Sequence, residues 1–269
     1  MTQSVGGWLQ AHNTLLDQHR YRLLEDFANL SRAQAMSDPD RCLSPTQQTH
    51  LEDAVAQLSS GKPYEYITGT AHFWNLELDV TEDVLIPRPD TELLVELAVA
   101  DSPTDARLCD LGTGSGAIAL AVAASRKDVQ VTACDMSPAA LEVCASNARR
   151  NALQDRLQLL AGDWLTAVPG AQFDVIVSNP PYIRQGDPHL SALKHEPEQA
   201  LVCGDGYAAL SKIIRNARQH LTAGGWLGVE HGYDQGPVVS RLFAHYGYEL
   251  VSAHNDLQGI HRVTRGHWQ

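Results

Sequence analysis

From Ala106 onward the sequence alternates short apolar runs with stretches of helical periodicity, and this alternation restricts the fold more than any other feature. Short apolar runs are typical of buried strands, and the segments between them are long enough for crossover helices. The expected strands are 106–111, 129–134, 157–161, 173–178 and 225–229, and the expected helices lie near 115–125, 137–151, 207–222 and 234–246. This order predicts a doubly wound parallel sheet that binds its ligand at the carboxyl ends of the strands.

Two more strands are expected near the end of the chain, at 248–254 and 261–265. They follow one another too closely for a crossover helix, so they should pair antiparallel and close the sheet. The predicted fold class is α/β, a doubly wound Rossmann-like sheet of seven strands whose last pair is antiparallel.

The N-terminal part has a different pattern. Residues 1–65 carry apolar positions at helical spacing, interrupted by Ser-Asp-Pro-Asp at 37–40 and by Gly-Lys-Pro at 61–63, which predicts a small helical bundle. Residues 66–90 are expected to form a hairpin that turns near Trp74 and Asn75, followed by a proline-rich linker in which Asp90 N-caps the next helix. Residues 91–269 would then be the sheet domain.

Composition excludes several classes of protein. No uninterrupted apolar run in the 269 residues approaches the roughly 20 residues of a membrane span, and no secretory signal begins the chain, so we expect a cytoplasmic protein. The net charge of −12 argues against non-specific binding to nucleic acid and favours a protein partner. Five scattered cysteines and twelve histidines show no metal-ligand spacing, so we expect no metal and reduced thiols.

A glycine-rich turn follows the first strand of the sheet domain. It has the order Gly-x-Gly-x-Gly over Gly112, Gly114 and Gly116, whereas a dinucleotide fingerprint is Gly-x-Gly-x-x-Gly. Asp110 stands just ahead of it, where a carboxylate would repel phosphates and favour the cationic amino group of a methionine moiety. The turn therefore favours S-adenosylmethionine over a nucleotide, without deciding between them.

The next two strand ends carry polar residues suited to an adenosine. Asp135 closes the second strand, where it could accept both ribose hydroxyls, cap the helix that starts at Ser137, or do both. Asp163 and Trp164 end the third strand, where they could contact the adenine amino group and ring, or be a turn aspartate and a core tryptophan.

The most specific motif is Asn179-Pro180-Pro181-Tyr182, which ends the fourth strand. The Asn179 side-chain oxygen and the Pro180 carbonyl can accept the two N–H bonds of a planar amide or amine, and Tyr182 can stack on it. An amide nitrogen is a poor nucleophile, so acceptors that fix its orientation and disperse its developing charge would assist methyl transfer. The motif predicts direct in-line displacement without a covalent enzyme intermediate.

These motifs together resemble the peptide-chain release factor glutamine N5-methyltransferase family. The resemblance covers about residues 60–266 and rests on four segments, namely the Asn179–Tyr182 tetrad, the Asp110–Gly116 turn, the linker Ile-Pro-Arg-Pro-Asp-Thr-Glu at 86–92, and Glu-His-Gly-Tyr-Asp-Gln-Gly at 230–236. It implies a class I methyltransferase sheet with S-adenosylmethionine as donor. The implied acceptor is the side-chain amide of the glutamine in the Gly-Gly-Gln loop of class-1 release factors.

The resemblance also assigns site residues by position. The cofactor-binding set is Gly112, Thr113, Gly114, Ser115, Gly116, Asp135 and Trp164, to which the strand-end argument adds Asp163 and Asn179. The acceptor would be held by Asn179, Pro180, Pro181 and Tyr182, and the helical domain would grip a release factor away from its loop. We expect a monomer that needs neither a membrane nor direct contact with nucleic acid.

Some residues keep two interpretations. Arg88 and Glu92 either face the mouth of the site and touch the substrate or form a surface ion pair with each other. We interpret Glu230 and His231 as polar residues at a strand end rather than an acid-base pair. His189 and His195 lie either in a mobile segment that covers the site or in a solvated loop. The alternative activities are glutamine methylation of a ribosomal protein, adenine N6 methylation of nucleic acid, and a non-catalytic module that binds translation factors.

Overall fold

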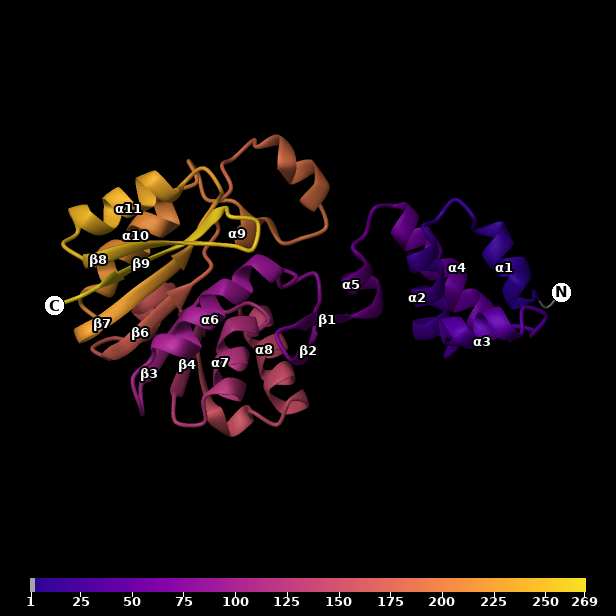
Figure 1. Cartoon of the computed structure of the whole chain (residues 1–269), viewed down its shortest axis with the longest axis horizontal. Coiled ribbons are helices and arrows are strands. Elements are labelled where there is room, and N and C mark those ends of the chain that lie inside the picture. Colours follow the sequence, from indigo (N-terminus) through magenta and orange to yellow (C-terminus); the bar gives the residue numbers. More distant parts are fainter. Residues whose placement is uncertain (1–2) are drawn as a thin grey trace. The chain divides into compact units, whose positions relative to one another are not determined.

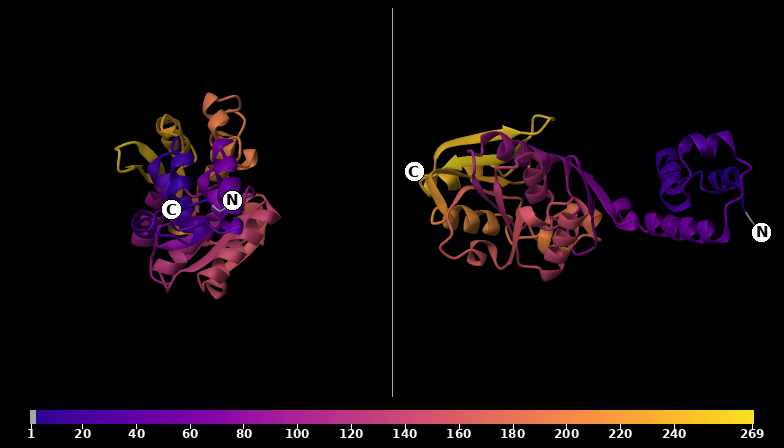
Figure 2. Two further views of the ribbon diagram at one scale, coloured as in Figure 1. Left: turned by 90° about the vertical axis from the view of Figure 1, so that its right-hand side faces the viewer. Right: turned by 90° about the horizontal axis from the view of Figure 1, so that it is seen from below.

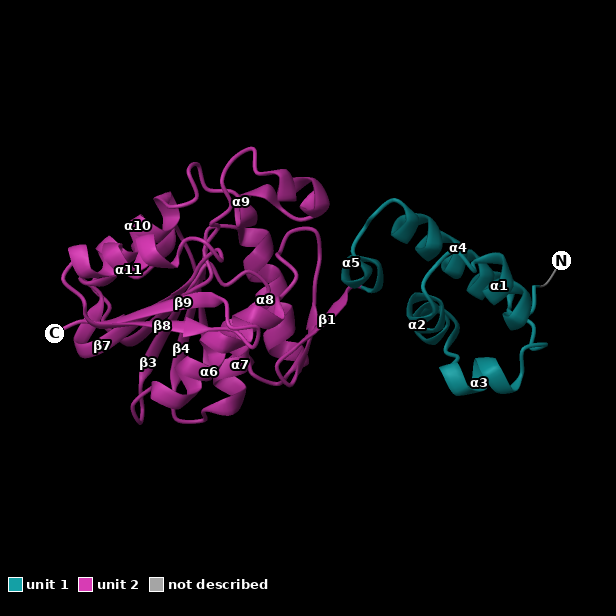
Figure 3. Cartoon of the chain, turned by 45° about the horizontal axis from the view of Figure 1, so that its top comes forward, with its two compact units in different colours: residues 1–68 teal, residues 69–269 magenta. Residues whose placement is uncertain are grey.

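The computed structural model describes residues 3–269. The chain forms two compact units, Met1–Thr68 and Gly69–Gln269, which Figure 3 shows in different colours. Within residues 3–269, no helix is both long and apolar enough to cross a membrane. The same residues contain no cluster of histidine, cysteine, aspartate or glutamate that could hold a metal ion.

The first unit is helical. Its helices are α1 (Val5–Ala11), α2 (Asp17–Ala28), α3 (Arg32–Ser37), α4 (Pro45–Ser59) and α5 (Tyr64–Thr68). Ser31 and Ser44 begin α3 and α4 with capping boxes, in which each serine is bonded reciprocally with a glutamine three residues later. Trp8, Leu23, Leu24 and Leu51 are fully buried at the centre, so this unit has a hydrophobic core of its own.

The second unit contains the predicted sheet of seven strands. They are β3 (Arg107–Leu111), β4 (Gln130–Asp135), β5 (Leu157–Ala161), β6 (Phe173–Ser178), β7 (Leu221–Glu230), β8 (Glu249–Asn255) and β9 (His261–His267). Their order in space is β5-β4-β3-β6-β7-β9-β8; β9 pairs antiparallel with β7 and β8, and the other pairs are parallel. The predicted fold class is confirmed. The C-terminal strands, yellow in Figure 2, form one edge of the sheet.

Helices cover both faces of this sheet (Figure 1). They are α6 (Glu92–Asp101), α7 (Ala117–Ser125) and α8 (Pro138–Arg150) on one face, and α10 (Ala208–Ala217) and α11 (Gly236–His245) on the other. Side chains of consecutive strand residues alternate between the faces, so Leu108 packs with α6 and α7 whereas Cys109 packs with α10. Because both faces are covered, most residues of the central strands are apolar and buried, and Asp110 of β3 is a fully buried exception. Short helices η1 (Pro89–Thr91), η2 (Gln154–Arg156), η3 (Trp164–Ala167), η4 (Pro188–Leu193) and α9 (Glu198–Leu201) lie in the connections.

The hairpin β1 (Thr70–Phe73) and β2 (Leu76–Asp79) turns at Trp74 and Asn75 as predicted. Asn147 of α8 attaches it to the sheet domain, because its buried side-chain amide donates to the carbonyls of Asp79 and Ser115, both at 2.9 Å. Ser115 belongs to the glycine-rich turn. The hairpin and this turn are thus held by one side chain.

Two local predictions are wrong. The helix expected over 207–222 ends at Ala217, because Leu221 already pairs with Phe173 as the first residue of β7. Asp90 does not cap α6; the two prolines first produce the turn η1, so Thr91 occupies the N-cap position while Asp90 forms an ion pair with Arg262.

Candidate active site

The glycine-rich turn lies at the carboxyl end of β3 and leads into α7. Gly112, Gly114 and Gly116 all have positive φ, at 71°, 54° and 85°, a backbone conformation that L side chains rarely adopt. The amides of Gly112 and Thr113 both donate to the carbonyl of Cys134, at 2.8 and 3.0 Å, so the turn is fixed to the end of β4. A Cβ at Gly114 would meet open space, which leaves this part of the backbone accessible to a ligand.

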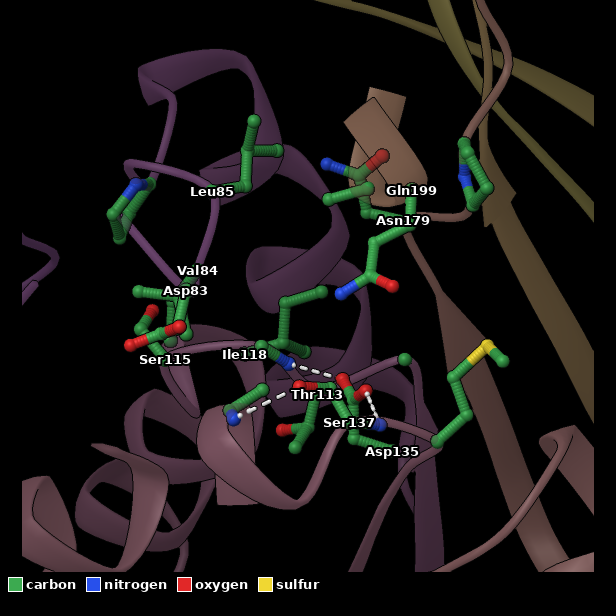
Figure 4. A pocket seen from close by; sticks show the side chains of 18 of the residues that line it. Asp83, Val84, Leu85, Thr113, Ser115, Ile118, Asp135, Ser137, Asn179 and Gln199 are labelled. Atoms are coloured by element: carbon green, nitrogen blue, oxygen red, sulfur yellow. Dashed lines mark hydrogen bonds between the residues drawn. The ribbon is translucent and has the colours of Figure 1, made fainter. Parts of the chain in front are cut away.

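Asp135 connects this turn to the next one. One carboxylate oxygen accepts from the Gly114 amide and the other from the Ser137 amide, each at 2.9 Å. Ser137, rather than Asp135, caps α8 through its hydroxyl. Figure 4 shows Asp135 with these bonds as dashed lines at one side of the cavity. Each oxygen keeps capacity for a further donor such as a ribose hydroxyl.

Trp164 follows β5 and packs across the glycine turn. Its φ is 53°, and a Cβ at Gly112 would lie only 2.8 Å from the edge of its ring. The absence of a side chain at Gly112 therefore allows the indole to line the cavity. The adjacent Asp163 also lines it and forms an ion pair with Lys212.

An open cavity lies over these strand ends. Its lining includes ten residues of the predicted site, namely Arg88, Gly112, Thr113, Gly114, Ser115, Asp135, Asp163, Trp164, Asn179 and Pro181. It also includes Asp83, Val84, Leu85, Pro87, Thr91, Met136, Gln199 and Ala200. Its charged side chains are three aspartates and Arg88, whose guanidinium is paired with Glu196. An acidic cavity disfavours a polyphosphate and suits a ligand with cationic groups, so the lining favours S-adenosylmethionine over a nucleotide, as the glycine spacing does.

Asn179 and Pro181 reach this cavity from the end of β6, and Figure 4 shows the Asn179 amide extending into it. The Asn179 Nδ2 donates to the Thr91 hydroxyl at 3.1 Å, which leaves Oδ1 available as an acceptor. The other two members of the tetrad do not line the cavity. Pro180 is buried, and the half-buried Tyr182 directs its hydroxyl to the Glu230 carboxylate at 3.5 Å.

The two linker residues of the predicted site have separate surroundings. Arg88 lines the cavity and pairs with the buried carboxylate of Glu196. Glu92 accepts from the Trp74 amide at 2.8 Å and does not line the cavity, so it fixes the hairpin turn. The interpretation in which Arg88 and Glu92 form an ion pair with each other is therefore wrong.

Two buried carboxyl groups lie behind the site. Burial raises the pKa of Asp110 to about 7, although the Thr113 hydroxyl, which donates to it at 2.7 Å, and the Ala119 amide oppose this increase. Because Asp110 does not line the cavity, the predicted contact of its carboxylate with a cationic ligand is not supported; it holds the glycine turn from behind. Burial likewise raises the pKa of Glu230 to about 7.

The histidines do not form an acid-base centre with these groups. Burial lowers the pKa of His231 to about 4, and its ring nitrogens lie 3.0 Å from the Gly232 carbonyl and 2.9 Å from the Thr264 hydroxyl. His189 pairs with Asp187 on the exposed helix η4, and neither it nor His195 lines the cavity. Their segment reaches the cavity only through Gln199 and Ala200 of α9.

Sequence reasoning missed several lining residues. Asp83, Val84 and Leu85 come just before the proline pair Pro87 and Pro89 and carry no motif of their own. Thr91 belongs to the linker motif at 86–92, but the sequence did not indicate its hydrogen bond with Asn179. No sequence pattern near Gln199 marks it as a site residue, because only the path of the chain between β6 and α10 brings it to the cavity.

Comparison with known proteins identifies the family. A family model described as "Methyltransferase small domain" matches residues 88–246, and one described as "PrmC N-terminal domain" matches residues 17–69. The release factor glutamine methyltransferase of Salmonella typhimurium is 45% identical over 269 residues, which cover 96% of this chain and 97% of that protein. The protein of the same name from Coxiella burnetii is 43% identical over 244 residues, covering 90% of this chain and 88% of that protein.

The chain belongs to the release factor glutamine methyltransferase family. It is an S-adenosylmethionine-dependent methyltransferase, in agreement with the acidic cavity at the strand ends. A solved methyltransferase from Pyrococcus furiosus has the same fold, with a TM-score of 0.57 and 18% identity, covering 80% of this chain and 98% of that structure.

Proposed function

We propose that this enzyme methylates the side-chain amide N5 of the glutamine in the Gly-Gly-Gln loop of class-1 release factors. The observation that carries the proposal is the Asn179 amide, whose Nδ2 is held by Thr91 while Oδ1 remains free at the cavity. A free carbonyl oxygen at this place suits an acceptor that brings N–H groups. The names of the relatives from Salmonella typhimurium and Coxiella burnetii supply the substrate class.

The cofactor would lie along the strand ends of β3, β4 and β5. We assign its binding to Gly112, Thr113, Gly114, Ser115, Gly116, Asp135, Asp163 and Trp164, with Asn179 at the boundary with the acceptor. The acidic lining of the cavity and the accessible Gly114 backbone support this assignment. When bound, S-adenosylmethionine supplies an electrophilic methyl group on a sulfonium, and this group can be displaced in line.

The enzyme's contribution would be to position the acceptor. Asn179 Oδ1 and the Pro180 carbonyl would accept the two amide N–H bonds, which turns the nitrogen face toward the methyl group and disperses its growing positive charge. The nitrogen loses a proton to water after the methyl group has been transferred. Pro181 and Tyr182 would shape the acceptor side, and Arg88 would contact the substrate backbone beside them.

We propose further that the helical unit recognises the release factor. It folds around a core of its own, and the N-terminal family model covers residues 17–69 of it and of the following turn. The net charge of −12 supports a protein rather than a nucleic acid as the partner. We expect one copy of the enzyme to act on one release factor.

Parallel methylation assays with different substrates test this proposal. The enzyme is incubated with tritiated S-adenosylmethionine and, separately, a class-1 release factor, ribosomal protein or unmethylated DNA. We expect label on the release factor alone. Label on ribosomal protein would support the alternative glutamine methyltransferase, and label on DNA would support the adenine N6 alternative; no label with measurable cofactor binding would support a non-catalytic module.

A further inference from the structure

Thr91 occupies the N-cap position of α6 without capping it. A threonine at this position ordinarily accepts from a backbone amide of the first helical turn, but the Thr91 side chain makes no such bond. Its hydroxyl, in a residue only 4% exposed, instead accepts from Asn179 Nδ2 at 3.1 Å. The same hydroxyl lies within reach of the Glu230 carboxylate, where as a hydrogen-bond donor it lowers the pKa of that group. Thr91 thus connects the side chain at the cavity to a buried acid.

Glu230 is the last residue of β7, next to the end of β6, and is 1% exposed. The hydroxyl of Tyr182 lies 3.5 Å from its Oε1, and its Oε2 has no hydrogen-bond partner among the described residues. One buried carboxyl group therefore contacts both Tyr182 and, through Thr91, Asn179.

The direction of these hydrogen bonds follows from the charge of Glu230. An ionised carboxylate only accepts, so the Thr91 hydroxyl proton points to Glu230 and the Thr91 oxygen must accept from its other neighbour. That neighbour, Asn179, then presents its NH₂ group to Thr91 and its Oδ1 to the cavity. A protonated Glu230 can donate to Thr91, which frees the Thr91 proton for Asn179 Oδ1 and allows the amide to turn over.

We propose that Thr91 and Glu230 are positioning residues whose hydrogen-bond chain fixes the Asn179 amide with its oxygen toward the methyl acceptor. This inference rests on the proposed role of Asn179 as acceptor of the substrate amide. With the Asn179 amide turned over, its NH₂ would face the NH₂ of the substrate, and two donors cannot bond.

The hydrogen-bond chain from Glu230 to Asn179, and with it kcat, should depend on pH. Burial raises the pKa of Glu230 to about 7 and Asp90 adds to the increase, whereas Thr91, Arg262 and Tyr182 oppose it. Asp90 and Thr91 belong to η1, Arg262 belongs to β9, and Tyr182 belongs to the segment after β6. At saturating cofactor and acceptor, kcat should fall as the pH drops below about 7.

The test compares Thr91→Val, which keeps the shape and removes the hydroxyl, with Thr91→Ser, which restores it, and with Glu230→Gln. We expect Thr91→Val to lower kcat about 10- to 100-fold with the cofactor Kd within about twofold of wild type, and Thr91→Ser to recover most of kcat. Glu230→Gln should lose the decline of kcat near pH 7. Equal losses in Thr91→Val and Thr91→Ser, or an unchanged pH profile in Glu230→Gln, would overturn the inference.

A second readout does not depend on any substrate. The side-chain amide of Asn179 is followed by ¹⁵N nuclear magnetic resonance and assigned by its loss in Asn179→Ala. We expect this signal to titrate near pH 7 in the wild type and to become independent of pH in Glu230→Gln and in Thr91→Val. If the signal titrates as expected but no release factor is methylated, the proposed function is wrong and the hydrogen-bond chain is supported. A signal that does not titrate in the wild type would refute the hydrogen-bond chain.

Discussion

Arg88 of the linker and Glu196, 108 residues later, form an ion pair beside the cavity. The Arg88 side chain is 36% exposed, whereas that of Glu196 is 3% exposed and its second oxygen has no partner among the described residues. The pair connects the linker to the segment that carries Gln199 and Ala200 to the cavity.

Replacing Arg88 alone should therefore lower the free energy of unfolding more than replacing both Arg88 and Glu196. Arg88→Gln leaves a buried carboxylate without its cation, and we expect a loss of about 1–2 kcal/mol, reduced from fully buried pairs because Arg88 meets solvent. The double variant Arg88→Gln with Glu196→Gln should recover part of that loss. Chemical denaturation measures the free energy of unfolding of each variant, and Arg241→Gln, at an exposed arginine, is the control. A double variant less stable than Arg88→Gln would contradict the pairing.

A methyl group at Gly112 should weaken cofactor binding. Gly112→Ala places a Cβ 2.8 Å from the Trp164 ring, whereas Gly170→Ala imposes the same φ of 71° with nothing within 4 Å. Both variants should lose about 1–2 kcal/mol of stability from backbone strain, and Gly112→Ala should lose more and bind S-adenosylmethionine at least about tenfold more weakly by calorimetry. Equal effects in the two variants would show that the contact with Trp164 is unimportant.

The Asn179 side chain should affect turnover and leave cofactor affinity nearly unchanged. Asn179→Ala removes the oxygen that faces the cavity, so we expect kcat to fall about 10²–10³-fold. Steady-state kinetics and cofactor titration separate the two quantities. Weaker cofactor binding with normal kcat at saturation would contradict the proposed role.

The buried carboxyl groups should make the folded protein less stable at high pH. The pKa values of Asp110 and Glu230 rise from 3.8 and 4.5 to about 7 on folding, so the folded state binds more protons than the unfolded state between about pH 4 and 7. The free energy of unfolding therefore decreases as the pH rises through this range. Glu230→Gln should have a higher Tm than wild type at pH 8, and the difference in Tm should be smaller at pH 5.

Thermal unfolding at the two pH values measures this difference. One kcal/mol corresponds to about 2–4 °C in a domain of this size, so an increase of several degrees is expected at pH 8. Glu249→Gln, at an exposed glutamate of β8, is the matched control and should show no such dependence on pH. A lower Tm for Glu230→Gln at pH 8 would show that the ionised carboxylate stabilises the fold.

The strand ends could be predicted because their positions depend on local sequence. Apolar runs at 106–111 and 173–178 mark strands buried on both faces, and a parallel sheet brings their carboxyl ends to one edge. This is why Gly112 and Asn179 could be expected at one cavity before the structure was known. The pairing of the last two strands followed in the same way from the short connection between them.

The contacts that depend on the path of distant segments could not be predicted. Arg88 pairs with Glu196 instead of Glu92 because the chain after β6 returns past the linker. The η1 turn makes Thr91, rather than Asp90, the N-cap residue of α6, and the Thr91 hydroxyl bonds to Asn179 instead of capping the helix. In each case several side chains nearby in sequence could form the ion pair or hydrogen bond, and tertiary packing decides which of them does.

The most direct test of the proposed activity is to locate the transferred methyl group. A class-1 release factor is incubated with the enzyme and S-adenosylmethionine, digested and sequenced by tandem mass spectrometry, beside a variant with alanine in place of the loop glutamine. We predict one added methyl group on the side chain of the Gly-Gly-Gln glutamine and none on the alanine variant. A methyl group on any other residue, or equal methylation of both proteins, would contradict the proposed function.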